Sequence, residues 1–152
     1  MASFDTDIYT SENGTAGQSP AFGYELSKFA GGKLRYKVIQ YVVDGAETTA
    51  DTINLCKMKA GAVVIPSLSR VITGTGLDVN DLNIGVSGND NKYADAMDTL
   101  DTASDIAFSG GDNHTAYTAV ASGGETIIAT LVAVTTSTAS STAVFLIAYV
   151  DE

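Results

Sequence analysis

Apolar and polar side chains alternate along residues 33–43, KLRYKVIQYVV. This period of two predicts a β-strand, because successive side chains of a strand point to opposite sides of a sheet. The two faces of the predicted strand are Leu34, Tyr36, Val38 and Val42 on one side, and Arg35, Lys37, Ile39 and Tyr41 on the other. Asp44 and Gly45 follow as a turn and end the strand.

Similar patterns predict seven further strands. They cover residues 52–59, 62–73, 82–86, 105–109, 115–121, 125–135 and 142–150. Pro66 has no N–H group to donate to a sheet, so the third strand must bulge or lie at an edge near this residue. The last two strands flank a Thr/Ser-rich loop at 136–141, which indicates an antiparallel hairpin. Residues 91–100 alone have the spacing of a short helix.

Eight short strands separated by turns indicate an all-β fold. A single-domain antiparallel β-sandwich is expected, and a jelly-roll-like arrangement is the natural form with eight strands. The length of 152 residues suits one domain, and we assign the sandwich to residues 33–152. The longest purely apolar run, residues 143–150, is too short to cross a membrane. The first residues lack the basic and apolar stretches of a secretory signal, so we expect synthesis in the cytoplasm of the producing cell.

The last predicted strand is apolar on both faces. One face carries Ala143, Phe145, Ile147 and Tyr149, and the other carries Thr142, Val144, Leu146, Ala148 and Val150. Both faces should therefore be covered, one by the opposing sheet and the other by an arm, a loop or a second subunit. This pattern favours a homo-oligomer, although a wholly internal strand would have the same pattern.

Residues 1–32 have no periodic pattern and are rich in Gly, Ser, Thr and Asn, which predicts an extended N-terminal arm. Five aromatic residues are scattered along this arm: Phe4, Tyr9, Phe22, Tyr24 and Phe29. Purely disordered tails are poor in aromatic residues, so we interpret the arm as a strap between subunits rather than a free terminus.

The formal net charge is −10, and the excess of negative charge lies in the second half of the chain. Residues 1–76 contain seven acidic and seven basic residues, whereas residues 77–152 contain eleven acidic residues and only Lys92 as a base. Such a surface disfavours DNA or RNA, since affinity for nucleic acid depends on Lys and Arg displacing counterions. The acidic half could serve solubility or contact a basic partner.

Candidate catalytic or ligand-binding residues are few. His114 is the only histidine, and Cys56 is the only cysteine, whose position in a strand suggests a small buried side chain. The run Asn89-Asp90-Asn91 offers oxygen ligands but lacks the spacing of an EF-hand, so a structural turn is favoured over a cation site. We therefore expect no catalytic residue, no metal site and no cofactor, and we predict that the chain is not an enzyme.

Two segments, KAGAVVIPSLSRV at 59–71 and LDVNDLNIGVSGNDNKYADAMD at 77–98, resemble small virion structural proteins of tailed bacteriophages. In those proteins the pattern belongs to β-sandwich subunits of the head-decoration or capsid-cement type, often trimeric, on the outer face of the capsid. The resemblance covers residues 52–109. Similar patterns also occur in tail and fibre components.

The resemblance implies a homotrimer that binds the major capsid protein, is located on the capsid surface and stabilises the shell. The basic residues expected to face acidic capsid or neighbouring subunits are Lys33, Arg35, Lys37, Lys57 and Lys59. The alternative is a tail, fibre or carbohydrate-binding adhesion module. Sugar binding would need exposed aromatic rings, and Tyr93 and Tyr117 are the candidates near the Asx-rich loops.

Overall fold

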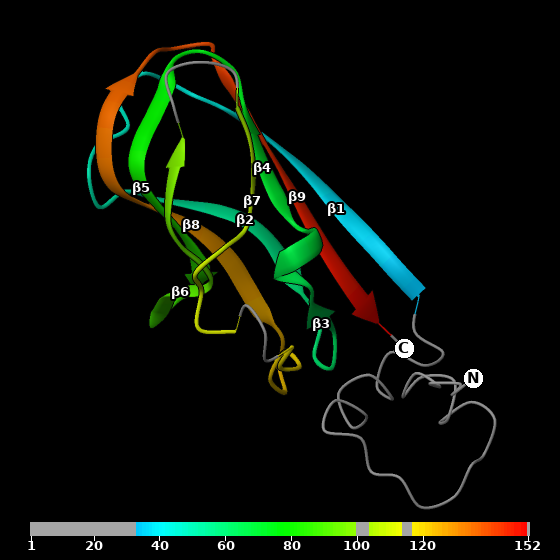
Figure 1. The fold of residues 1–152 in the computed structure, drawn as a ribbon. Helices are drawn as coiled ribbons and strands as arrows, with labels where there is room; N and C mark the ends of the chain where they lie inside the picture. The colour runs from blue at the N-terminus through cyan, green and yellow to red at the C-terminus, as the bar shows by residue number, and fades with distance from the viewer. Residues whose placement is uncertain (1–32, 100–103, 114–116, 152) are drawn as a thin grey trace, which may run out of the picture.

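The computed structural model describes residues 33–99, 104–113 and 117–151. These residues form β-strands and one short 3-10 turn (Figure 1). The elements are β1 (Lys33–Val42), β2 (Thr52–Met58), β3 (Val63–Val64), η1 (Pro66–Leu68), β4 (Arg70–Thr73), β5 (Leu77–Val86), β6 (Asn89–Thr99), β7 (Ser104–Ala107), β8 (Glu125–Ser137) and β9 (Thr142–Asp151). None of the described residues belongs to a helix that is long and apolar enough to span a bilayer.

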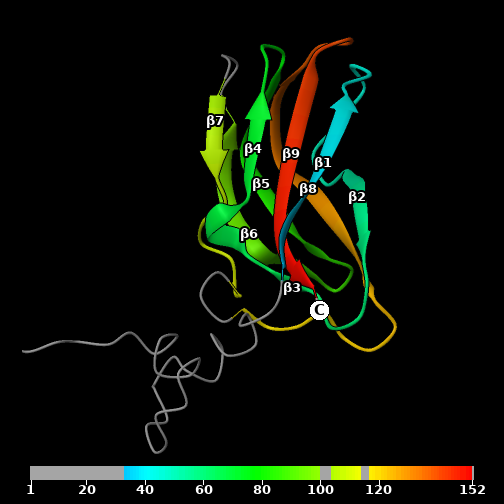
Figure 2. The ribbon, with the colours of Figure 1, turned by 90° about the vertical axis from the view of Figure 1, so that its right-hand side faces the viewer.

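Two antiparallel sheets face each other as a sandwich. One sheet has the order β1-β9-β4-β7, with β3 also paired to β9, and the other has the order β2-β8-β5-β6. Figure 2 shows the first sheet in front of the second, with β7 at the left and β1 toward the right, and β2, an edge strand of the second sheet, lies to the right of β1. The predicted all-β sandwich is confirmed.

The strand pairing is that of a jelly roll. If β3 and β4 are counted as one interrupted strand, the described chain has eight strands, and the first pairs with the eighth, the second with the seventh, the third with the sixth and the fourth with the fifth. The chain thus pairs as if it were folded in half and then rolled up, which is how two Greek keys combine in this fold.

Pro66 interrupts the third strand, as its missing N–H group requires. The chain leaves the sheet at Ile65, makes the η1 turn and returns as β4. The fully buried Ser69 repairs the gap, since its hydroxyl donates to the Ile65 carbonyl at 2.9 Å and accepts from the Ala148 N–H at 2.9 Å. The predicted break at the proline is confirmed.

The predicted helix at 91–100 is wrong. The part of it that the structure describes belongs to β6, which pairs with β5 across a tight turn at Ser87 and Gly88, where Gly88 has φ +85°. Register shifts make β6 irregular, and Ala96 has φ +51°. These bulges break the alternation of a strand, so that buried Tyr93, Ala94 and Met97 have the spacing of a helix face.

The hairpin predicted for the last two strands is also wrong. β8 belongs to one sheet and β9 to the other, so the loop between them crosses from sheet to sheet. Loop length and composition do not distinguish these two connections. The predicted strand at 115–121 is reduced, among its described residues, to one isolated bridge between Ala119 and Val63.

The core lies between the two sheets. β9 contributes Phe145 and Ile147, and β8 contributes Ile127 and Leu131, all at most 1% exposed. Burial of each such side chain stabilises the fold by about 1.5–3 kcal/mol relative to exposure. On the outer face of β9, Ala148 and Val150 are buried, whereas Val144 and Leu146 are half-buried, so the prediction of two covered faces holds for the inner face and only partly for the outer one.

Candidate interaction surfaces

The carboxylate of Glu47 is fully engaged by neighbouring donors. It accepts hydrogen bonds from the Tyr41 hydroxyl at 2.6 Å, the Asp44 N–H at 2.8 Å, the Gly45 N–H at 3.0 Å and the Ser137 hydroxyl. Burial would raise the pKa of Glu47, but hydrogen bonds from Ser137, Tyr41 and the Asp44 backbone outweigh it and lower the pKa to about 2. The group is a structural tie between β1, the following loop and β8.

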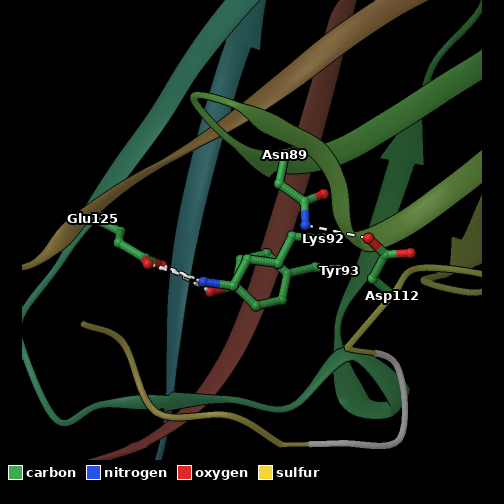
Figure 3. A network of polar contacts seen from close by, with 5 residues as sticks. All are labelled: Asn89, Lys92, Tyr93, Asp112 and Glu125. Carbon is green, nitrogen blue, oxygen red and sulfur yellow. Dashed lines mark hydrogen bonds and ion pairs between the residues drawn. The ribbon is translucent and has the colours of Figure 1, made fainter.

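A second polar network links β6 to β8. Lys92 donates to both oxygens of Glu125, at 2.9 and 2.7 Å, and the Tyr93 hydroxyl lies 3.3 Å from the same carboxylate (Figure 3). Asn89 donates to Asp112 at 3.2 Å beside it. Burial, followed by the negative charge of Glu125, raises the pKa of the Tyr93 phenol. Tyr93 is only 1% exposed, so the prediction that it could stack against a sugar is wrong.

Cys56 is half-buried and packs against the core. Burial raises the pKa of its thiol, against the opposing effect of Lys37. The thiolate is the reactive form of cysteine, so this environment is unlike that of a catalytic nucleophile. Among the described residues, no group of three or more His, Cys, Asp or Glu side chains is placed to hold a metal ion. His114 lies outside the described residues.

We expect native Cys56 to react with a disulfide reagent at pH 7.5 several-fold more slowly than Cys56 in the urea-unfolded chain. The measurement is the release of the coloured thiolate over time, with Cys56→Ser as the blank. Equal rates in the native and unfolded chains would show that the thiol is neither shielded nor perturbed.

The basic residues singled out from the sequence gather at one lateral edge of the sandwich. Lys33, Arg35 and Lys37 belong to edge strand β1, while Lys57 lies in edge strand β2 and Lys59 just after it. We call this surface the basic edge. Asp151 is tied into it by Arg35 at 2.7 Å and Lys59 at 2.8 Å, and hydrogen bonding to Lys59 is the main cause of its lowered pKa.

The opposite lateral edge is acidic. It is formed by β6 and β7, the edge strands on the other side of the two sheets. The acidic residues of these strands are Asp90, Asp95, Asp98 and Asp105. We call this surface the acidic edge. Its one base, Lys92, is held by Glu125, and Asp105 also accepts from Arg70 of β4 at 2.7 Å.

The outer face of the first sheet exposes apolar side chains. Leu34, Tyr36 and Val38 of β1 are 48%, 52% and 67% exposed. Val42 of β1 is also exposed. Farther across the molecule, Ile72 of β4, which pairs with β7, and Leu68 of η1 are exposed. The alternation of β1 predicted this face correctly. The five aromatic residues of the N-terminal arm, Phe4, Tyr9, Phe22, Tyr24 and Phe29, lie outside the described residues.

Comparison with solved structures finds this fold in phage capsids. A chain of the cyanophage Pam1 capsid asymmetric unit superposes with a TM-score of 0.54 and 22% identity, over 88% of this chain and 91% of that one. A chain of the Ralstonia phage GP4 capsid superposes with a TM-score of 0.58 and 15% identity, over 79% and 85%. They share its fold. No protein-family model and no curated protein matches the chain.

The resemblance to phage virion proteins, suggested by the segments at 59–71 and 77–98, is thus confirmed at the level of fold. Sequence reasoning found the basic residues of β1 and β2 but missed that acidic residues form a matching edge. The signal that could have found it is the density of Asp in residues 90–105. Its location opposite β1 depends on strand order, which spacing does not reveal.

Proposed function

We propose that this chain is a non-enzymatic structural protein of a tailed-phage virion, which decorates and stabilises the capsid by binding the outer face of the major capsid protein lattice. The observation that carries the proposal is the fold, shared over most of both chains with components of two phage capsid structures. Each alignment spans most of the neighbour, so these neighbours are chains of similar length. A single small sandwich suits an accessory subunit.

The physical properties of the described residues support this role. A jelly roll with its core between two sheets is rigid, and its acidic groups at Glu47 and Glu125 are used in structural ties. The described surface carries two charged edges with exposed apolar side chains beside them. A cement subunit gains its effect from many repeated contacts, and a rigid body with separate surfaces for different neighbours can supply them.

In this role each predicted surface has a partner. The N-terminal arm, residues 1–32, straps across a boundary between capsid subunits through its aromatic side chains. The basic edge contacts acidic surfaces of the capsid protein or of a neighbouring copy. The subunit is a homotrimer, made in the host cytoplasm and located on the virion surface, and it makes no direct contact with nucleic acid.

The test of the role is the copy number in purified particles. Mass spectrometry of intact virions and of empty, tail-less shells should find the chain in both, at a ratio to the major capsid protein that is fixed by the lattice. A chain present only in tailed particles belongs to the tail, and a chain absent from both is not a virion component. Either result would reject the proposal.

Deleting residues 2–31 should abolish binding to capsids and leave the sandwich folded. The arm is the part of the chain whose aromatic residues have no predicted role in the core, so its loss removes contacts with the lattice alone. Co-sedimentation with shells lacking the chain measures occupancy, and circular dichroism with thermal unfolding checks the fold. Unchanged occupancy would reject the arm as the strap.

A further inference from the structure

Positive and negative charge are separated on the two lateral edges of the sandwich. Residues 33–42 and 52–59 contain five bases, Lys33, Arg35, Lys37, Lys57 and Lys59, and no acid. The strands at the other edge, β6 and β7, contain four acids and one base, and that base is held by Glu125. Strand order places these two groups on opposite sides, because each sheet has one of its edge strands at each side.

Both edges also combine charge with exposed apolar side chains. Leu34, Tyr36 and Val38 project from the outer face of β1, next to the basic edge. On the same face of the sheet, Ile72 is exposed beside Asp105 of β7, next to the acidic edge, and Leu68 of η1, a turn that contacts β7, is exposed too. Protein interfaces commonly have an apolar centre and a polar rim, and each edge offers both parts.

The backbone at these edges is available for contact. Within the described part of the chain, β1 pairs with β9 alone, and it runs for ten residues. An edge strand of this length presents unpaired N–H and C=O groups, and proteins protect such edges with Lys and other charges or cover them with another chain. The basic residues of β1 protect it from indiscriminate pairing, and an acidic partner would neutralise them.

We infer that the basic edge of one copy binds the acidic edge of a second copy, in a head-to-tail contact that repeats from copy to copy. The occupant is a second copy because this chain itself carries the complementary surface. A contact between two different surfaces of identical chains is heterologous, and it closes into a ring when the rotation permits. The inference rests on the proposed function, where it gives the oligomer its interface and leaves the capsid to other surfaces.

The test uses charge reversal on the full chain. One variant, Lys33→Glu with Lys37→Glu and Lys57→Glu, leaves two bases on the basic edge against three new acids and Asp151, so that both edges are acidic. A second variant, Asp90→Lys with Asp95→Lys and Asp98→Lys, leaves Asp105 as the one acid of β6 and β7, so that both edges are basic. Four of these side chains are exposed and two, Lys37 and Asp95, are partly exposed, and all six lie outside the ion pairs of Asp151 and Glu125. A third variant, the combined variant, carries all six changes and so exchanges the two edges. The control, Thr75→Glu with Thr135→Glu, adds acidic groups at exposed positions away from both edges.

Sedimentation velocity at low salt measures self-association without capsids. The wild-type chain and the control should associate alike, and each single-edge variant should associate about tenfold or more weakly, because like charges then face each other across the contact. The combined variant should recover association. An equal mixture of the two single-edge variants should also associate, since an acidic copy can alternate with a basic one. Raising the salt from about 0.1 M to 1 M shortens the Debye screening length from about 10 Å to about 3 Å, which should weaken the contact between wild-type copies.

A wild-type chain that remains a monomer at all concentrations, single-edge variants that associate like the wild type, or a combined variant that does not recover would each overturn the inference. Circular dichroism confirms that each variant is folded before it is compared.

Binding to capsids is measured separately on shells lacking the chain. Loss of capsid binding by the variant with Lys33→Glu, Lys37→Glu and Lys57→Glu, with normal self-association, would make the capsid protein the partner of the basic edge. Self-association without any capsid binding by the wild type would reject the proposed function and leave this inference standing.

Discussion

Replacing Glu47 with glutamine should lower the free energy of unfolding by about 2–3 kcal/mol at pH 7. The carboxylate accepts four hydrogen bonds, from Tyr41, Asp44, Gly45 and Ser137, and the residue is 9% exposed. A glutamine side chain has one acceptor oxygen, and its NH2 group would face donors that the carboxylate now satisfies. Urea unfolding of the wild type and the variant measures the difference.

The same substitution should flatten the dependence of stability on acid. The pKa of Glu47 falls from 4.5 to about 2 in the folded chain, so its contribution is complete above the unfolded value and is lost as the pH falls from about 5 to about 2. The variant has no such group and should lose less stability over this range. Asp51→Asn is the control, because its carboxylate is exposed and accepts hydrogen bonds from the N–H and the hydroxyl of Thr48 in the same loop. An unchanged free energy of unfolding at pH 7, or an unchanged slope between pH 5 and 2, would show that Glu47 is not a tie.

The hydrogen bonds of Glu47 could not be predicted from the sequence. Its donors come from β1, in one sheet, and from Ser137 of β8, in the other, ninety residues away. A glutamate between Ala46 and Thr48 looks like any loop residue, because nothing local indicates which distant hydroxyl will meet it. The strand of KLRYKVIQYVV, by contrast, was predicted correctly because alternation is a local property.

The errors at β6 and β8 have the same origin. Three buried residues of β6, Tyr93, Ala94 and Met97, follow helical spacing because bulges against β5 shift the register. β8 and β9 follow each other in the sequence but lie in different sheets, since β8 pairs with β2 and β5 while β9 pairs with β1 and β4. Both outcomes are decided by long-range pairing, which a pattern of residues records only indirectly.

For the candidate surfaces, composition predicted the charges and topology gave their positions. The concentration of bases before Arg70 and of acids after it is visible in the sequence. The rolled-up pairing of the chain then brings β1 beside β2 and β6 beside β7 on opposite sides. A separation of charge along the chain thereby becomes a separation of charge across the molecule, which is the property that a repeating contact between copies requires.

Replacing Phe145 with alanine should lower the free energy of unfolding by about 3–5 kcal/mol, whereas replacing its neighbour Val144 should cost about 1 kcal/mol or less. Phe145 is 1% exposed on the inner face of β9, opposite Ile39 and Val71 in the register, so its loss leaves a cavity between the sheets. Val144 is half-buried on the outer face, opposite Gln40 and Ile72. Thermal unfolding measures the stability of the two variants. For a chain of this length, Phe145→Ala should lower Tm by on the order of 10 °C.

The two substitutions distinguish apolar side chains that build the core from those that border a contact surface, since β9 is apolar on both faces. If the inner face builds the core and the outer face borders a contact surface, Phe145→Ala should destabilise the isolated chain at every concentration. Val144→Ala should leave the monomer stable. Similar losses of stability for the two variants at low protein concentration would mean that the outer face is covered within a single copy. The exposed side chains of β1 would then be ordinary surface.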